Sequence, residues 1–303
     1  MIDWNSLTYP PAPPRSEVFP AFLIGVFFVA AVVLIPFEGI WDNPAAVAIV
    51  VAVAAALFVV TVAIHRTRAL TAVALVLLAW QSVMAIDQDQ LPQAFRGLSP
   101  QSISDLSSSS RLLILRAGVL ALPFAMTLIL TFAIPSARQR FREYFRFGNW
   151  CAGISWPLPW WGVPAMPFWM LFALTLPGSI PAFLPFIDWA MTAQRWGTFS
   201  YAMIVMIPLL ALLNAFMEET VFRFGLMALL SDHLSVPAAT IPAAVIFGFV
   251  HFHGGYPNGL LGAMLLSLGG FFLGYFVVVQ KGISGAVLWH MIMDVVILSC
   301  VFK

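Results

Sequence analysis

The chain has 303 residues, of which 61% are hydrophobic and only 9% are charged. A soluble globular domain carries about 25% charged residues, so this composition argues against a soluble protein and predicts a polytopic membrane protein. The net charge of +1 gives no sign of nucleic-acid binding, and two cysteines are too few for a disulfide framework. We therefore expect an all-α fold, a polytopic helical bundle with about 8–9 transmembrane helices.

The N-terminal stretch, residues 1–18, contains four prolines and lacks the charged-then-apolar order of a secretory signal. We expect it to form an extended cytoplasmic arm. Apolar stretches of roughly the length that a spanning helix needs, about 20 residues, then follow one another to the C-terminus. The expected spans are residues 19–40, 44–64, 69–86, 112–134, 165–187, 200–230, 236–252, 258–279 and 283–302.

A short basic stretch, residues 138–149, separates the fourth and fifth expected spans. Arg138, Arg140, Arg142 and Arg146 alternate there with aromatic residues, a pattern typical of an amphipathic segment on the cytoplasmic membrane surface. The distribution of Lys and Arg over the short loops places the N-terminus in the cytoplasm. We expect a multi-pass protein of a prokaryotic inner or plasma membrane, with N-terminal spans over residues 19–199 and a separate helical core over 200–303.

Three ionisable residues interrupt the apolar stretch 200–230, namely Glu218, Glu219 and Arg223. Such groups are costly at bilayer depth and face the interior of a bundle or a water-filled cavity. Glu219 and Arg223 are i, i+4 neighbours on one helix face, so we expect them to pair and to leave Glu218 available for chemistry. The alternative is that both glutamates pair structurally, although one arginine does not readily neutralise two buried carboxylates.

Two later apolar stretches carry histidine. Phe247 and His251 share one helix face, and His290 and Asp294 are again i, i+4 neighbours. A lone histidine on an apolar helix is usually a core residue, but here the preceding helix carries an unexplained carboxylate. Carboxylate and imidazole are the groups that activate water in hydrolases. We therefore expect Glu218 and these polar groups to meet in one buried site.

Three short motifs result from this spacing. They are E-E-x-x-x-R at residues 218–223, F-x-x-x-H at 247–251 and H-x-x-x-[ND] at 290–294. Their order on successive apolar helices resembles the CPBP (Abi) family, the CAAX prenyl endopeptidases and bacteriocin-processing proteins, over roughly residues 200–302. The last motif position is often asparagine in that family and is Asp294 here, and an ionised aspartate cannot donate a hydrogen bond to an oxyanion.

The resemblance implies an intramembrane protease of the glutamic type that uses no cofactor. It implies that Glu218 is the general base and that His251 is its partner on the attacking water. His290, assisted by Asp294, would stabilise the oxyanion. The supporting residues would be Glu219, Arg223 and Phe247. The implied substrate is a membrane protein or a lipid-modified peptide; a prenylated C-terminus, a signal-like peptide and a bacteriocin leader all remain open.

Two other interpretations use the same residues. Glu218, His251 and His290 are a possible His₂Glu zinc set, although the chain lacks the H-E-x-x-H motif of helix-borne zinc proteases. Alternatively, the polar groups line a transporter pathway or belong to a non-catalytic membrane scaffold. Transporters often contain internal repeats, and none is evident in this sequence.

Overall fold

The computed structural model describes residues 16–19, 21–25, 68–84, 108–154, 166–170, 172–173, 201–252 and 259–301. Almost all of the described secondary structure is helical, which confirms the predicted fold class. The helices are α3 (Arg68–Met84), α6 (Ser108–Ala133), α7 (Pro135–Tyr144), α10 (Tyr201–Glu219), the π-helix η5 (Thr220–Leu226), α11 (Met227–Leu230), α12 (Val236–Val250), α13 (Gly259–Gln280) and α14 (Ser284–Val301). Two short strands, β1 (Gly153–Ile154) and β2 (Met166–Pro167), pair antiparallel.

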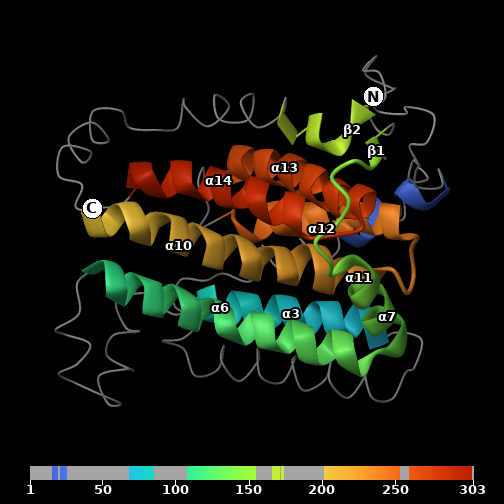
Figure 1. The fold of residues 1–303 in the computed structure, drawn as a ribbon. Helices are drawn as coiled ribbons and strands as arrows, with labels where there is room; N and C mark the ends of the chain where they lie inside the picture. The colour runs from blue at the N-terminus through green and yellow to red at the C-terminus, as the bar shows by residue number, and fades with distance from the viewer. Residues whose placement is uncertain are drawn as a thin grey trace, which may run out of the picture.

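Helix α10 occupies the middle of the bundle (Figure 1). It packs against α14 on one side and against α6 on the other, while α12 pairs with α13 and α3 pairs with α6. The short sheet aligns Gly153 with Pro167 and lies at the periphery of the bundle. The fold therefore surrounds the end of α10, where the acidic residues lie, with helices from both ends of the described chain.

The predicted number of membrane spans is not confirmed. Within the described part of the chain, two helices are long and apolar enough to cross a membrane, Ile204–Leu230 and Gly259–Gln280. A bent pair, Leu120–Ala133 with Pro135–Tyr144, adds a third if it forms one span. Helix α12 has only 15 residues, about 22 Å at the α-helical rise, which is shorter than the hydrocarbon layer of about 30 Å.

Three of the expected spans cannot be compared in full. The described residues leave out 26–67, which include most of the stretch 19–40 and all of the stretch 44–64. They also leave out 174–187, the second half of the stretch 165–187. The beginning of that last stretch contains β2 and a short helical segment, so it is not one continuous helix. The other expected helices agree with the structure to within a few residues at most ends.

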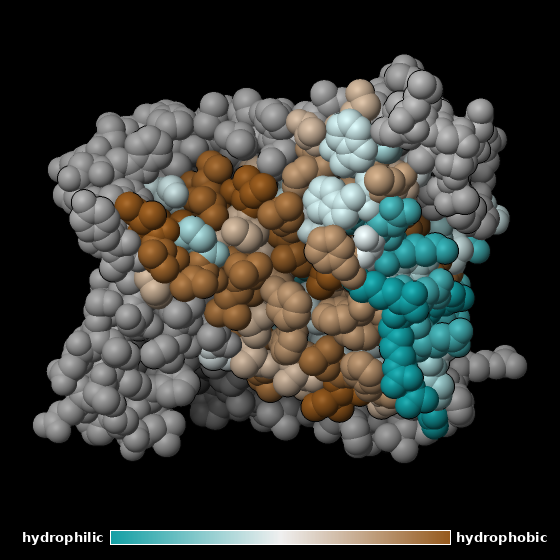
Figure 2. Space-filling view, in the orientation of Figure 1, coloured by the Kyte–Doolittle hydropathy of each residue, from teal (hydrophilic) through white to brown (hydrophobic). Residues whose placement is uncertain are grey.

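The break between α6 and α7 results from Pro135. Ile134 is extended (φ −99°, ψ 114°) because a following proline disfavours the helical region, and proline itself fits the first turn of the next helix. The two helix axes differ by 114°. Arg138, Arg140 and Arg142 of α7 are exposed, and Figure 2 shows a hydrophilic surface where Figure 1 places α7, beside a hydrophobic one. That α7 lies on the cytoplasmic membrane surface stays a prediction.

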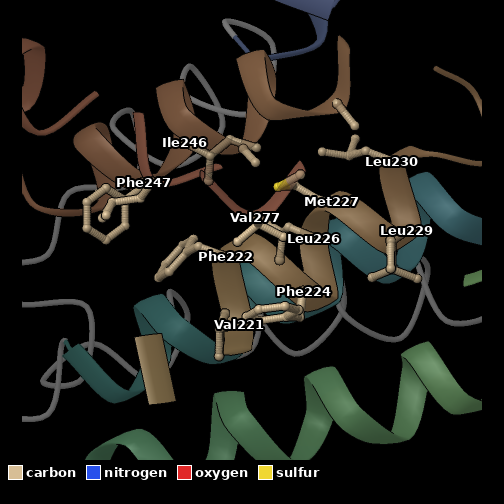
Figure 3. Packing of buried hydrophobic residues seen from close by; sticks show 14 of the residues in the cluster. Val221, Phe222, Phe224, Leu226, Met227, Leu229, Leu230, Ile246, Phe247 and Val277 are labelled. Carbon is tan, nitrogen blue, oxygen red and sulfur yellow. The ribbon is translucent and has the colours of Figure 1, made fainter. Parts of the chain in front are cut away.

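The hydrophobic core is centred on η5 and α11. Figure 3 shows their side chains between α12, α13 and the helices below them, with Phe222 directed toward Phe247. The rings of these two phenylalanines meet edge to face, 5.2 Å between centroids, and Trp80 of α3 covers Phe222 at 4.8 Å. Edge-to-face contacts of this kind stabilise a core beyond simple burial. They fix η5 against α12 and so fix the acidic residues just before η5.

Candidate active site

The acidic pair lies where the α-helix changes to a π-helix. Glu218 and Glu219 are the last residues of α10, and η5 begins at Thr220 and includes Arg223. The Thr220 hydroxyl donates to the carbonyl of Phe216 at 2.7 Å, a local bond that competes with the regular helical pattern. The sequence predicted one continuous helix over residues 200–230, so the π-helix was missed. Such segments are rare and occur frequently at functional sites.

Arg223 and Glu219 form the predicted ion pair. Arg223 Nε lies 3.3 Å from Glu219 Oε2, and the side chains are 1% and 0% exposed. The guanidinium carbon also lies 3.8 Å from the centroid of the Phe247 ring, a cation–π contact. Across from it, a Cβ at Gly270 would lie 3.1 Å from Arg223 Nη2 and 3.0 Å from Phe247 Cδ1, so glycine provides the space for this pair.

His251 follows α12 directly. The helix ends at Val250, two residues earlier than expected, and His251 is the residue that caps it. Its Nδ1 lies 2.7 Å from the carbonyl oxygen of Phe247, and its Nε2 lies 3.5 Å from Glu218 Oε2. A carbonyl only accepts, so Nδ1 carries the proton and the neutral ring presents a lone pair at Nε2. Phe247 thus fixes the tautomer of the histidine that faces Glu218.

His290 of α14 contacts all three nearby carboxyl groups. Its Nδ1 lies 2.7 Å from Glu219 Oε1, while its Nε2 lies 3.8 Å from Glu218 Oε2 and 3.6 Å from Asp294 Oδ1. The short hydrogen bond is the one to Glu219, which therefore joins the histidine to Arg223.

Asn214 is a site residue that the sequence analysis missed. It lies one helical turn before Glu218 on α10, and its Nδ2 donates a hydrogen bond of 2.9 Å to Asp294 Oδ2. The sequence signal for Asn214 is its i, i+4 spacing to Glu218 within an otherwise apolar helix. An asparagine in an apolar helix is less conspicuous than a charged residue, and its partner is 80 positions away in the sequence.

The site is more open on the histidine side than behind the glutamates. Glu218 is 1% exposed, whereas His251, His290 and Asp294 are 13%, 11% and 15% exposed. The structure therefore brings together all four residues predicted to be catalytic, with Glu218 at the inner end. Carboxylate and imidazole groups at these distances can share and transfer the protons of a small molecule bound between them.

No group of three or more His, Cys, Asp and Glu side chains in the described ranges has a geometry that could hold a metal ion. The donor set of the zinc interpretation, Glu218, His251 and His290, is described in full. The zinc interpretation stays a prediction, and a chelation experiment is its direct test.

Apolar helices long enough to cross a membrane indicate an integral membrane protein, and they lie around a buried carboxylate–imidazole site. Residues 199–296 match the family model described as Type II CAAX prenyl endopeptidase Rce1-like, so this part of the chain carries an Rce1-like domain. The match confirms the resemblance to the CPBP family and contains all three sequence motifs. No curated protein and no solved structure matches the chain.

Proposed function

We propose that this protein is a glutamic-type intramembrane endopeptidase that hydrolyses a peptide bond in a membrane-associated protein or lipid-modified peptide. The observation that carries this proposal is the position of Glu218 Oε2, 3.5 Å from His251 Nε2 and 3.8 Å from His290 Nε2. One carboxylate thus faces two imidazoles from two other segments of the chain. The Rce1-like domain supports the protease class and a CAAX-type substrate.

The first step is activation of water between Glu218 and His251. The ionised carboxylate and the Nε2 lone pair of His251 are both acceptors, so a water molecule seated between them donates one hydrogen to each. Its oxygen lone pair is then free to attack the scissile carbonyl carbon. Glu218 takes the water proton as the carbon–oxygen bond forms, and general-base catalysis of this kind contributes about 10²–10⁴-fold.

The second step is stabilisation of the tetrahedral oxyanion by His290. Because its Nδ1–H is donated to Glu219, a neutral His290 would offer only a lone pair at Nε2. The role therefore requires the imidazolium, which Glu219 stabilises from behind and Asp294 assists at Nε2. The intermediate then collapses, the C–N bond breaks, and the proton held by Glu218 passes to the leaving amine.

The discriminating experiment compares membrane fractions of cells that express the wild-type chain or Glu218→Gln, with protein termini measured by mass spectrometry. We expect termini that appear with the wild type and fall by at least about 100-fold with the variant, because the amide cannot act as a base. Equal levels of both proteins in the membrane are the control. Unchanged termini would reject the base assignment, and a scaffold or transporter would then explain the chain better.

A second experiment separates metal-independent activation of water by Glu218 and His251 from the zinc interpretation. Purified protein is treated with a strong chelator and assayed on a quenched-fluorescence peptide ending in a prenylated CAAX motif. Retained activity after chelation supports the metal-independent mechanism. Loss of activity that returns on addition of Zn²⁺ would instead assign Glu218, His251 and His290 as metal ligands.

A further inference from the structure

The hydrogen bond between Asn214 and Asp294 connects the two helices that carry most of the site. Asn214 lies one turn before Glu218 on α10, and Asp294 lies one turn after His290 on α14. The Nδ2–Oδ2 distance is 2.9 Å, and the pair is partly buried. The helices α10 and α14 pack along each other, so this bond fixes their relative register one turn away from the reacting groups.

We propose that Asn214 is a positioning residue for the hydrolytic site, a role that rests on the proposed function. By donating to Oδ2, its amide leaves the other carboxylate oxygen of Asp294 directed at His290, where Oδ1 lies 3.6 Å from Nε2. His290 is then held at Nδ1 by Glu219 and approached at Nε2 by Asp294. Asn214 thus acts on the oxyanion side of the site through Asp294 and does not itself touch the substrate.

An amide at position 214 suits a carboxylate at position 294 for a simple chemical reason. An ionised carboxylate only accepts hydrogen bonds, whereas an amide both donates and accepts. The pair therefore also tolerates an exchange in which the carboxylate moves to α10 and the amide to α14. Carboxylates at both positions cannot bond unless one of them is protonated, and two like charges at this distance repel.

The different hydrogen-bonding capacities of amide and carboxylate allow a charge-exchange test in the whole 303-residue chain. The variants are Asn214→Asp, Asn214→Leu, Asp294→Asn and the double exchange Asn214→Asp with Asp294→Asn. The readout is the rate at which the Glu218-dependent termini appear in membranes, with Glu218→Gln as the blank. Each purified variant also has its thermal unfolding midpoint measured, so that loss of fold is separated from loss of rate.

We expect Asn214→Asp and Asn214→Leu to slow cleavage by about 10-fold or more, because the bond to a charged partner is lost. The double exchange restores the bond with its polarity reversed, and we expect it to cleave at least about threefold faster than Asn214→Asp alone. A purely structural tie would instead lower the unfolding midpoint of the single variants and leave the rate per folded molecule unchanged.

Two outcomes overturn the inference while leaving the proposed function intact. They are an Asn214→Asp variant that cleaves like the wild type, and a folded double exchange that cleaves no faster than Asn214→Asp alone. If the wild type itself yields no Glu218-dependent termini, the proposed function has failed. The unfolding midpoints of the four exchange variants then test the bond by themselves, and additive effects of the two substitutions would show that the residues do not interact.

Discussion

At the level of single residues, the buried charge of Arg223 needs partners that stabilise it. A fully buried guanidinium is held by one carboxylate and one aromatic ring, Glu219 at 3.3 Å and Phe247 at 3.8 Å. Burial of either charge alone would be far less favourable than burial of the pair. Because Glu219 also binds His290 at 2.7 Å, the ion pair determines where the ring of that histidine lies.

We expect Arg223→Met to destabilise the protein by about 3–5 kcal/mol, since it keeps most of the side-chain volume but removes the buried cation that faces Glu219 Oε2. The measurement is the unfolding midpoint of purified protein in detergent. Arg140→Gln is the matched control, because Arg140 pairs with Glu143 at 3.0 Å on an exposed surface. Such surface pairs contribute only about 0–1 kcal/mol.

The same two variants also separate a supporting role from a catalytic one. If Arg223→Met were as stable as the wild type but inactive, Arg223 would act directly in the chemistry and its assignment as a supporting residue would be wrong. If both variants lost the same small amount of stability, the buried Arg223–Glu219 pair would stabilise the protein no more than the exposed Arg140–Glu143 pair.

At the level of elements, the close packing of α12 on α13 places His251 opposite Glu218. Gly248 is central to this packing, because a Cβ there would collide with the carbonyl oxygen of Ala263 and the hydroxyl of Ser267. Gly248 lies three residues before His251, and its carbonyl accepts the His251 N–H at 3.2 Å. Separation of the two helices would therefore displace the histidine.

We expect Gly248→Ala to destabilise the protein by about 1–3 kcal/mol through overpacking, and to reduce cleavage more than stability because His251 moves. Gly269→Ala is the matched control on the same helix pair, since a Cβ at Gly269 meets nothing within 4 Å. In that open position alanine is the better helix former, by about 0.5–1 kcal/mol. Both variants are compared by unfolding midpoint and by the Glu218-dependent termini, and equal effects would contradict this account of the α12–α13 contact.

At the level of the whole molecule, one polar contact joins the start of the described chain to its C-terminal half. Glu17 Oε2 accepts a hydrogen bond of 2.8 Å from the backbone N–H of Ser235, the residue that precedes α12. Hydrogen bonding to Ser235 lowers the pKa of the Glu17 carboxyl from its ordinary value of 4.5. The contact holds residues 16–19 against the turn between α11 and α12.

This lowered pKa predicts a dependence of stability on pH. A carboxyl whose folded pKa lies below its unfolded pKa adds stability above the unfolded value, and that stability is lost as the pH falls through the folded pKa. We therefore expect Glu17→Gln to lower the unfolding midpoint near neutral pH. The difference from the wild type should shrink below about pH 4.5 as the wild-type carboxyl is protonated. A difference that stays constant down to about pH 3 would show that Glu17 acts without its charge.

The sequence by itself determined the helical fold, the apolar character of the chain and the ionisable residues that meet at the candidate site, although not Asn214. A composition with 9% charge leaves few polar groups to place, so each one inside an apolar stretch is informative. The i, i+4 spacing of Glu219 and Arg223 was sufficient to predict their ion pair because helix geometry is local. The predicted ends of the last four helical stretches were also nearly right, because glycine, proline and loss of apolar character are local signals too.

Only the tertiary structure decided how these residues are connected. The π-helix at Thr220, the bond from His290 to Glu219 and the partner of Asn214 all depend on how α10, α12 and α14 pack. The number of spans also depends on packing, since α12 is too short to cross a bilayer by itself yet is apolar enough to look like a span. Periodicity along one helix cannot show which side chain of another helix it will meet, because that choice depends on contacts between residues far apart in the chain.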